Sequence, residues 1–422
     1  MKLREYQRIG ERVYFERLEN GLGLFYIQKL DYHKSYAFFA TNYGGADRRF
    51  NLNGEWIDTP AGVAHFLEHK MFDMPDGNAL TELSMNGANP NAFTSSSMTA
   101  YHFECTGRFW ENLEILLKFV STPYFTPESV EKEQGIIGQE IRMTEDDPDY
   151  SLYYGLMKIL YKHNPVRNSV AGTVESISEI TADTLNNCFK VFYNPNNMVL
   201  CIVGDQDPEK VAETARNILP KYRGIVPERD YGKKENLKPT KQYSERIMEV
   251  GMPMFMMGAK DGASRTGDEQ LKRELLAELS LELLIGRSSP LYSKLYGDGL
   301  INGSFSAEYE TMAGQSFVAL GGESRDPKKA YEEISLAAGK MALDGVDNAA
   351  FNRQKKAAIG KLLRGLNNFD DIAYATARGY FMGYDMFNAI ELLESIKADD
   401  IVKFISEIFA PERLALSVVK NN

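Results

Sequence analysis

Cysteine is scarce in this chain of 422 residues. Only Cys105, Cys188 and Cys201 occur, and none belongs to a C-x-x-C pair. A sparse, odd-numbered set excludes a disulfide-stapled scaffold and is typical of a reducing compartment. We therefore expect all three side chains to be buried as small apolar groups.

Long apolar runs and a surplus of basic residues are also missing. No stretch approaches the ~18 uncharged apolar residues that span a membrane, and segment 1–6 lacks the apolar core of a signal peptide. The 48 basic residues are outnumbered by 59 acidic ones, so the formal net charge is -11. A nucleic-acid-binding protein would need a basic face. These absences predict a cytoplasmic protein that binds neither membranes nor nucleic acid.

The composition that remains is ordinary for a globular protein, 43% hydrophobic and 25% charged, in a chain long enough for two or three domains. A helix-turn-strand pattern at residues 180–203 recurs without a gap at residues 396–419, 216 residues later. The identical positions are Ala182 and Ala398, Asp183 and Asp399, and Pro195 and Pro411. Such self-similarity indicates a duplicated domain.

The segment between the two copies predicts the domain boundary. Residues 221–242 hold two prolines and two glycines and show no sustained periodicity. We therefore divide the chain into an N-terminal domain of residues 1–225 and a homologous C-terminal domain of residues 226–422.

Strand signals precede helix signals in each half. Asn20-Gly21 between two apolar runs predicts a β-hairpin, and residues 25–27 and 36–43 are typical of strands. The longest predicted helices cover residues 60–72, 110–121, 127–144 and 182–193. This order predicts an α+β fold in which helices pack on one face of a mainly antiparallel sheet.

Two of the chain's five histidines lie in one pentapeptide, H-F-L-E-H, which begins at His65. Thr59 as N-cap and Pro60 in the first turn predict a helix that carries it. His65 and His69 are then one turn apart on the same face, and Glu68 joins that face. Two imidazoles so placed can bind one zinc ion while the carboxylate reaches a water molecule. The pattern is the inverted form of the H-E-x-x-H helix of zinc proteases.

A plainer interpretation exists, in which both histidines are hydrogen-bonded core side chains and Glu68 is a surface acid. A zinc protease also needs a third protein ligand. The predicted helix at residues 127–144 and the residue that follows it hold five candidates, Glu128, Glu131, Glu133, Glu140 and Glu145. Glu133 and Glu140 are two turns apart on one face. Spacing alone does not choose among these acids, because an acidic helix is usually a solvated face.

The pentapeptide together with Glu140, which follows His69 after 70 intervening residues, resembles the pitrilysin–insulysin family of inverted-zincin metallopeptidases. That family includes the mitochondrial processing peptidase. Supporting segments occur at residues 62–65, 91–94, 133–140, 172–173 and 194–198. The length and the duplication match the family's half-size, bacterial processing-peptidase-like members. The resemblance implies two domains that together form half of a clam-shell chamber.

The resemblance also implies roles for individual residues. His65, His69 and Glu140 would bind one zinc ion per chain. Glu68 would be the general base toward the attacking water, and Glu133 a second carboxylate beside the site. An edge strand would bind an extended peptide through main-chain hydrogen bonds. This strand would include Asn91, Ala92, Phe93 and Thr94.

The C-terminal half has lost the motif. Leu281 and Ile285 stand 216 residues after the two histidines, so we expect one metal site per chain. Self-sufficient family members carry an Arg and, seven residues later, a Tyr that reach the substrate from this half. In a loose register, Tyr296 and Gly303 stand at those positions here. The resemblance therefore implies a heterodimer in which a homologous, zinc-free subunit supplies Arg and Tyr; a homodimer is the alternative.

Together these inferences predict a zinc endopeptidase that cleaves short unstructured peptides or leader segments inside a closed dimeric chamber. Two other classes stay open. One is a non-catalytic, zinc-binding structural subunit of a complex, and the other is a metal hydrolase with a non-peptide substrate.

Overall fold

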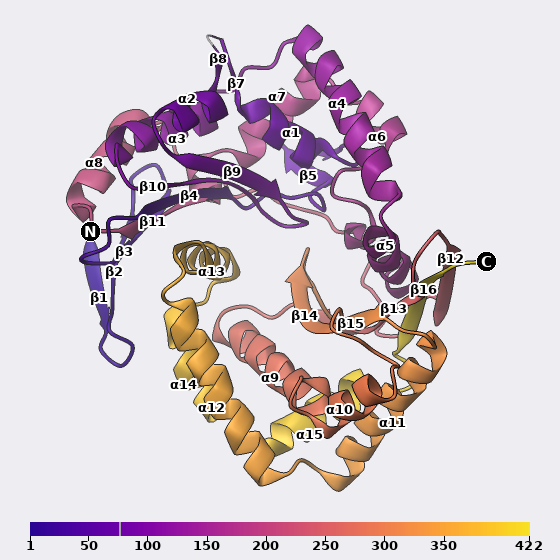
Figure 1. The fold of residues 1–422 in the computed structure, drawn as a ribbon. Coiled ribbons are helices and arrows are strands. Elements are labelled where there is room, and N and C mark those ends of the chain that lie inside the picture. Colours follow the sequence, from indigo (N-terminus) through magenta and orange to yellow (C-terminus); the bar gives the residue numbers. More distant parts are fainter. Residues whose placement is uncertain (76) are drawn as a thin grey trace. The chain divides into compact units, whose positions relative to one another are not determined.

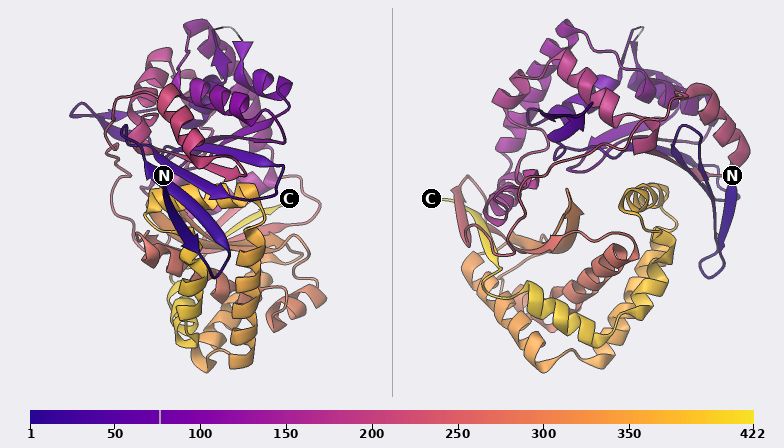
Figure 2. Two further views of the ribbon diagram at one scale, coloured as in Figure 1. Left: turned by 90° about the vertical axis from the view of Figure 1, so that its left-hand side faces the viewer. Right: turned by 180° about the vertical axis from the view of Figure 1, so that it is seen from behind.

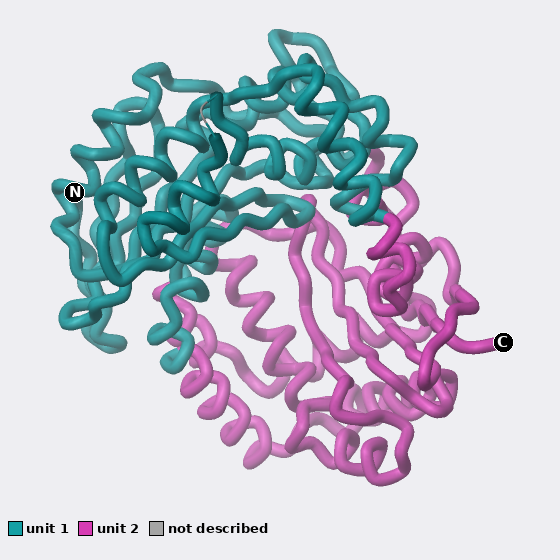
Figure 3. The backbone as a smooth tube through the Cα atoms, turned by 45° about the horizontal axis from the view of Figure 1, so that its top comes forward, with its two compact units in different colours: residues 1–141, 169–231, 363–386 teal, residues 142–168, 232–362, 387–422 magenta. Residues whose placement is uncertain are grey.

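The computed structural model describes residues 1–75 and 77–422 and divides the chain into two compact units (Figure 3). Unit 1 consists of Met1–Ile141, Ser169–Tyr231 and Leu363–Met386. Unit 2 consists of Arg142–Asn168, Gly232–Leu362 and Phe387–Asn422. Each unit therefore contains a segment from the other half of the sequence. The predicted halves, residues 1–225 and 226–422, describe the duplication and stay a prediction; the compact units follow a different division.

Unit 1 is built on a seven-stranded sheet. Its strands are β1 (Lys2–Tyr6), β2 (Glu11–Arg17), β3 (Gly23–Gln28), β11 (Met198–Gly204), β4 (Ser35–Thr41), β10 (Thr99–Cys105) and β9 (Asn89–Thr94), in that spatial order. Only β3 and β11 pair in parallel. The hairpin predicted at Asn20-Gly21 is confirmed, because β2 and β3 flank it and pair antiparallel. Two short hairpins accompany the sheet, β5 (Arg49–Leu52) with β6 (Glu55–Asp58) and β7 (Asp73–Met74) with β8 (Gly77–Asn78).

A layer of helices covers one face of this sheet (Figure 1). It contains α1 (Val63–Met71), α2 (Ala79–Met85), α3 (Phe109–Ser121), α4 (Pro127–Glu145) as far as Ile141, α6 (Val174–Ser178), α7 (Ala182–Phe192) and α8 (Pro208–Ile218). The core lies between these helices and alternate residues of the strands. Tyr101 of β10, for example, is fully buried with its ring 5.6 Å from those of Phe72 and Phe119. All three cysteines are free and buried, as predicted.

On the opposite face of the sheet lies α13 (Phe369–Met382), a helix that the sequence did not predict there (Figures 1 and 2). Tyr374 of α13 packs its ring 6.5 Å from that of Phe38 and 6.0 Å from that of Phe93. These two residues alternate with the core-facing residues of their strands. Part of the second face is therefore covered as well.

Unit 2 repeats the plan around a five-stranded sheet. The strands, in spatial order, are β12 (Tyr243–Ile247), β16 (Ala415–Lys420), β13 (Met254–Ala263), β15 (Gln315–Glu323) and β14 (Ser306–Met312). Its helices are α5 (Pro148–Leu160), α9 (Asp268–Ile285), α10 (Pro290–Gly297), α11 (Pro327–Asp344), α12 (Asn348–Gly365) as far as Leu362, α14 (Ala389–Ser395) and α15 (Ala398–Ile408). The α+β class with two sheet-containing domains is confirmed. In the described ranges no helix is long and apolar enough to cross a membrane.

The predicted repeat has the same local structure in both copies. Helix α7 begins at Ala182 and α15 begins at Ala398, and each is followed by a buried inner strand, β11 or β16. One helix from each half of the sequence packs on the sheet of the other unit. Helix α5, from the first half, packs on the sheet of unit 2, and α13, from the second half, packs on the sheet of unit 1.

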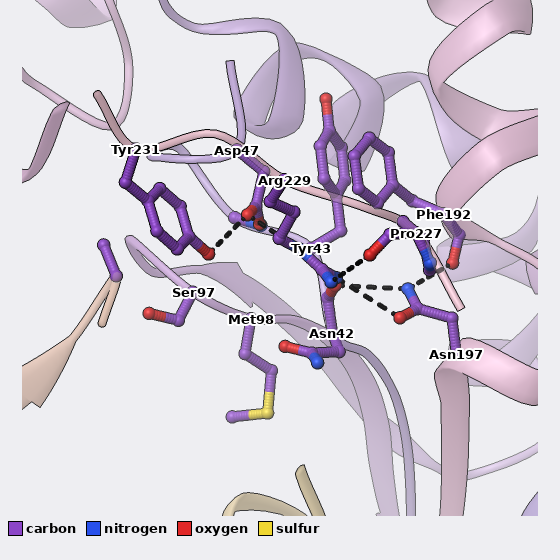
Figure 4. Close-up of polar contacts among 12 residues, drawn as sticks. Asn42, Tyr43, Asp47, Ser97, Met98, Phe192, Asn197, Pro227, Arg229 and Tyr231 are labelled. Atoms are coloured by element: carbon purple, nitrogen blue, oxygen red, sulfur yellow. Dashed lines mark hydrogen bonds and ion pairs between the residues drawn. The ribbon is translucent and has the colours of Figure 1, made fainter. Parts of the chain in front are cut away.

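The segment after α8 is anchored to unit 1 by a buried ion pair (Figure 4). The Nε of Arg229 lies 2.9 Å from Oδ1 of Asp47, which also accepts a 2.8 Å hydrogen bond from the hydroxyl of Tyr231. Arg229 donates further to the backbone oxygen of Asn42 and, at 3.2 Å, to Oδ1 of Asn197. The predicted boundary segment is therefore fixed on unit 1 as far as Tyr231.

Candidate metal centre

Helix α1 carries the H-F-L-E-H motif, but it begins later than predicted. Its N-cap is Gly62, in the left-handed region at φ 98°, and Val63 is its first residue. The predicted cap at Thr59 is wrong, because the hydroxyl of Thr59 donates to the backbone oxygen of Arg48 instead. A helix that started at Pro60 would have to run through the left-handed glycine, which the local sequence signals did not anticipate.

Gly62 is required by a close backbone contact as well as by its φ. A Cβ at this position would lie 2.5 Å from the backbone oxygen of Ala171. Helix α6, which follows this loop, makes a second contact just before α1, because the hydroxyl of Ser176 donates to the backbone oxygen of Ala61 at 2.8 Å. The loop before α6 and α6 itself thus hold the N-terminal end of the motif helix.

We expect Gly62→Ala to lower the free energy of unfolding by about 1–3 kcal/mol, because it combines a strained backbone with this clash. Gly135→Ala is the matched control, since Gly135 lies inside α4 with open space around its Cβ position; it should stabilise the protein by about 0.5–1 kcal/mol. Urea denaturation of both variants measures the difference. Equal stability of the two variants would contradict the role of the Gly62 contact.

The structure brings His65, His69 and Glu140 together. Nε2 of His65 lies 3.5 Å from Oε1 of Glu140, and Nε2 of His69 lies 3.6 Å from Oε2 of the same carboxylate. One potential ligand atom from each residue lies within 4.8 Å of the others, and this is the one such group of three found among the described residues. Two imidazoles and a carboxylate are the donor set of a catalytic zinc site with an open fourth position.

Glu133, one of the five acids that spacing left open, lies beside His69. Its Oε1 is 3.0 Å from Nδ1 of His69, so that ring can donate to Glu133 while Nε2 faces Glu140. Burial lowers the pKa of His69, but the hydrogen bond to Glu133 and the nearby carboxylates outweigh it and raise the pKa. A carboxylate on the far nitrogen of a histidine fixes its tautomer and strengthens it as a metal ligand.

His65 is held in its neutral form. Burial, with a smaller contribution from His69, lowers the pKa of His65 to about 4. Its Nδ1 is buried and has no hydrogen-bond partner among the described residues, whereas Nε2 faces Glu140. A neutral imidazole whose Nε2 lies beside the carboxylate of Glu140 and whose Nδ1 has no partner in the described part of the chain fits a metal ligand better than a hydrogen-bonded core histidine.

Glu68 lies between the two histidines in sequence and is 8% exposed. Burial raises its pKa, although a hydrogen bond from Thr94 opposes the shift. The hydroxyl of Thr94 donates to Oε2 of Glu68 at 2.8 Å. This contact was not predictable from the sequence, because nothing in the spacing of Thr94 and Glu68 shows that β9 passes beside α1. A raised carboxylate pKa is typical of groups that transfer protons near neutral pH.

The predicted substrate-binding residues 91–94 lie on β9, an edge strand whose one partner strand in the described part of the chain is β10. The side chain of Asn91 accepts a 2.8 Å hydrogen bond from the N–H of Ala92. Thr94 points toward Glu68, and Phe93 packs on the opposite face against α13. One side of the strand therefore remains available for another extended chain, next to the candidate base.

Comparison with known proteins identifies the family. A zinc protease of Bacillus subtilis (strain 168), named YmfH and called uncharacterized, is 40% identical over 427 residues, which is 98% of each chain. The chain belongs to the M16 peptidase family. Residues 54–174 match the family described as insulinase (peptidase family M16), and residues 179–358 match the family described as peptidase M16 inactive domain.

Two further M16 relatives are informative. A crystal structure described as that of an M16-like peptidase from Alicyclobacillus acidocaldarius has a TM-score of 0.94 at 31% identity, covering 98% of this chain and 99% of that chain. A protein of Arabidopsis thaliana, named as a beta subunit of mitochondrial-processing peptidase, is 25% identical over 40% of this chain and 34% of its own. The family resemblance read from the motif is thereby confirmed.

The C-terminal half of this M16 protein differs as its sequence indicates. Leu281 and Ile285 are buried in α9, where the first half has its histidines. Tyr296 is 55% exposed near the end of α10, and Gly303 lies in the turn before β14. Both belong to unit 2. Their assignment to the degenerate Arg and Tyr positions stays a prediction.

Removing the Glu133 side chain is expected to weaken zinc binding by about 10–100-fold, the usual loss for a carboxylate behind a metal-ligating histidine. Glu131→Ala is the control, since Glu131 is an exposed acid on the same helix. Competition with a chromogenic zinc chelator measures the affinity of Glu133→Ala. Glu133→Gln, which keeps an acceptor for His69, should fall between the two. Wild-type affinity in Glu133→Ala would show that the 3.0 Å contact does not support the metal.

Proposed function

We propose that this M16 chain is a zinc endopeptidase that cleaves short unstructured peptides or leader segments. The observation that carries the proposal is the convergence of His65, His69 and Glu140, with Glu68 buried on the same helix as the histidines. The name of the Bacillus subtilis relative, a zinc protease, supports the class of metal and of reaction.

His65, His69 and Glu140 would hold one zinc ion per chain. When bound, zinc acts as a Lewis acid that polarises the scissile carbonyl and lowers the pKa of a water molecule. Glu68 would accept the proton of the attacking water and deliver it to the leaving amine, as general base and then general acid. Thr94 would hold Oε2 of Glu68 in place, and Glu133 would orient His69.

The substrate would add to the free side of β9 as an extended strand. Main-chain hydrogen bonds along residues 91–94 would bind peptides of many sequences, since they do not depend on side chains. The Asn91 side chain that now accepts from the N–H of Ala92 would give way to a substrate carbonyl. Only an unfolded segment can present such a free strand, which favours short peptides and leader segments.

A second subunit would complete the enzyme. Tyr296 offers no guanidinium where self-sufficient relatives have Arg, and Gly303 offers no phenol where they have Tyr. A homologous zinc-free partner would therefore supply both groups and close a chamber around the peptide. The name of the Arabidopsis relative, a processing-peptidase subunit, supports a paired assembly. A homodimer is the alternative assembly, and we place the complex in the cytoplasm.

A quenched fluorescent peptide library tests this function on the purified, zinc-loaded chain, alone and mixed with a homologous M16 chain that lacks the zinc motif. We expect little cleavage by the chain alone and at least about a hundredfold more in the mixture, comparable to other lost transition-state contacts. Strong cleavage by the chain alone would support the peptidase and reject the heterodimer. No cleavage in either case, with zinc bound, would favour a different role.

That different role is a zinc-binding structural subunit without catalysis. One observation favours it, the match of residues 179–358 to a family described as inactive. This match lies outside the segment that holds the histidines, since they fall within residues 54–174, the part matched to insulinase. The intact ligand set and the buried Glu68 therefore make the peptidase the better-supported function.

A further inference from the structure

A second site lies wholly within unit 2, whereas the candidate metal centre belongs to unit 1. It is a pocket of about 560 Å³, a volume suited to a small molecule. Its walls come from residues 161–167, from residues 234–240 and from Lys260 on β13. No step of the proposed peptidase reaction uses these residues.

The lining of this pocket is strongly basic although the chain carries a net charge of -11. Its formal cations are Lys162, Arg167, Lys234, Lys238 and Lys260, joined by His163. Glu235 is the only acid in that lining. Like charges gathered in one concave site repel one another and raise the local affinity for anions.

Glu235 balances only one of these five charges, and its carboxylate is already engaged in hydrogen bonds. It accepts backbone N–H hydrogen bonds from Lys162 at 3.0 Å, His163 at 2.5 Å and Asn164 at 2.8 Å. Its Oε2 also lies 3.7 Å from Nζ of Lys260. Burial raises its pKa, but these donors outweigh burial and lower it. One carboxylate faces five cations, so an excess of four positive charges remains.

Two buried donors in the lining also lack partners. Tyr161 is fully buried, and its hydroxyl has no hydrogen-bond partner among the described residues. The same holds for Nε of Arg167, while its Nη1 donates to the backbone oxygen of Lys162 at 3.3 Å. Leaving a buried donor unpaired costs about 1–3 kcal/mol. Since neither atom has exposed surface, an anion in the pocket contacts the charged side chains and reaches these two donors only through a local rearrangement.

We propose that this pocket binds a small multivalent oxyanion of the polyphosphate class. A single carboxylate would neutralise only one of the four excess charges, whereas linked phosphates carry several charges and offer many acceptors. Arg167 provides the planar donor set that recognises phosphate, and the lysines act as point charges around it. The occupant is thus defined by charge and by acceptor number.

Isothermal titration of the zinc-loaded chain with inorganic tripolyphosphate, at fixed ionic strength in chloride, tests the proposal. We expect one site per chain. Lys234→Gln/Lys238→Gln, at two exposed positions, should weaken binding at least about tenfold, since hydrogen bonds to charged groups contribute about 1.5–3 kcal/mol each. Tyr161→Phe removes only a buried hydroxyl and leaves the charge unchanged, so it should leave the affinity close to the wild-type value.

Lys340→Gln/Lys356→Gln is the matched control, with the same loss of charge at lysines of unit 2 outside the pocket. Tripolyphosphate also complexes divalent metals. Because the control variant keeps the metal site intact, its titration shows how much of the heat comes from the bound zinc. Affinity lost in the pocket variant and kept in the control would support the site. No binding at millimolar tripolyphosphate, or an equal loss in both double variants, would overturn it.

Discussion

Replacing Glu68 by Gln is expected to lower kcat/KM for peptide hydrolysis by about 10²–10⁴-fold, the range that a positioned general base contributes. The substitution keeps the size of the side chain and can keep the contact with Thr94, since an amide oxygen also accepts from a hydroxyl. It removes only the ability to take a proton. Zinc stoichiometry should stay at the wild-type value, because Glu68 is not one of the three residues that converge as ligands.

Two further variants sharpen this test. Thr94→Val should lower activity less than Glu68→Gln, because the carboxylate remains and loses only its positioning. Glu131→Gln neutralises an exposed acid of α4 and should leave activity unchanged. Steady-state kinetics on one peptide, with metal analysis of each variant, give the comparison. Full activity in Glu68→Gln would mean that another group takes the proton and that the proposed mechanism is wrong.

The sequence could predict the motif helix and its chemistry because those depend on local spacing. Residues i and i+4 of a helix share a face whatever surrounds it, so the proximity of His65 and His69 needed no tertiary information. The start of that helix did need it. Gly62 adopts its left-handed conformation against Ala171, which is distant in the sequence, and no rule for N-caps contains that contact.

The choice among the acids of α4 shows the same limit. Periodicity paired Glu133 with Glu140, but it could not say which face of α4 lies against α1. The family resemblance implied that Glu140 is the ligand. The distances now distinguish the two acids, because Glu140 lies beside Nε2 of both histidines and Glu133 lies beside Nδ1 of His69. The exchange of α5 and α13 between the units was not predictable either, because an amphipathic helix does not specify which sheet it covers.

His65→Ala is the second variant with a large expected effect, since it removes a ligand while leaving Glu68 in place. Zinc affinity should fall by more than the roughly 100-fold that a supporting residue costs, and peptidase activity should fall with it. Wild-type protein in zinc at about 1,000 times its Kd should gain about 4 kcal/mol in the free energy of unfolding, and the variant, for which zinc is then below about 10 times its Kd, should gain less than about 1.4 kcal/mol. Thermal denaturation with and without zinc measures this difference.

His102→Ala is the matched control for His65→Ala. His102 lies on β10 of the same unit, and burial lowers its pKa to about 4, as it does for His65. Its Nδ1 is 2.8 Å from the hydroxyl of Tyr36, and it is not in the ligand group. Both variants delete a half-buried imidazole, so both should lose packing energy, but only His65→Ala should lose the response to zinc. If zinc stabilised both variants equally, His65 would be a core histidine after all, and the metal centre would have to be sought elsewhere.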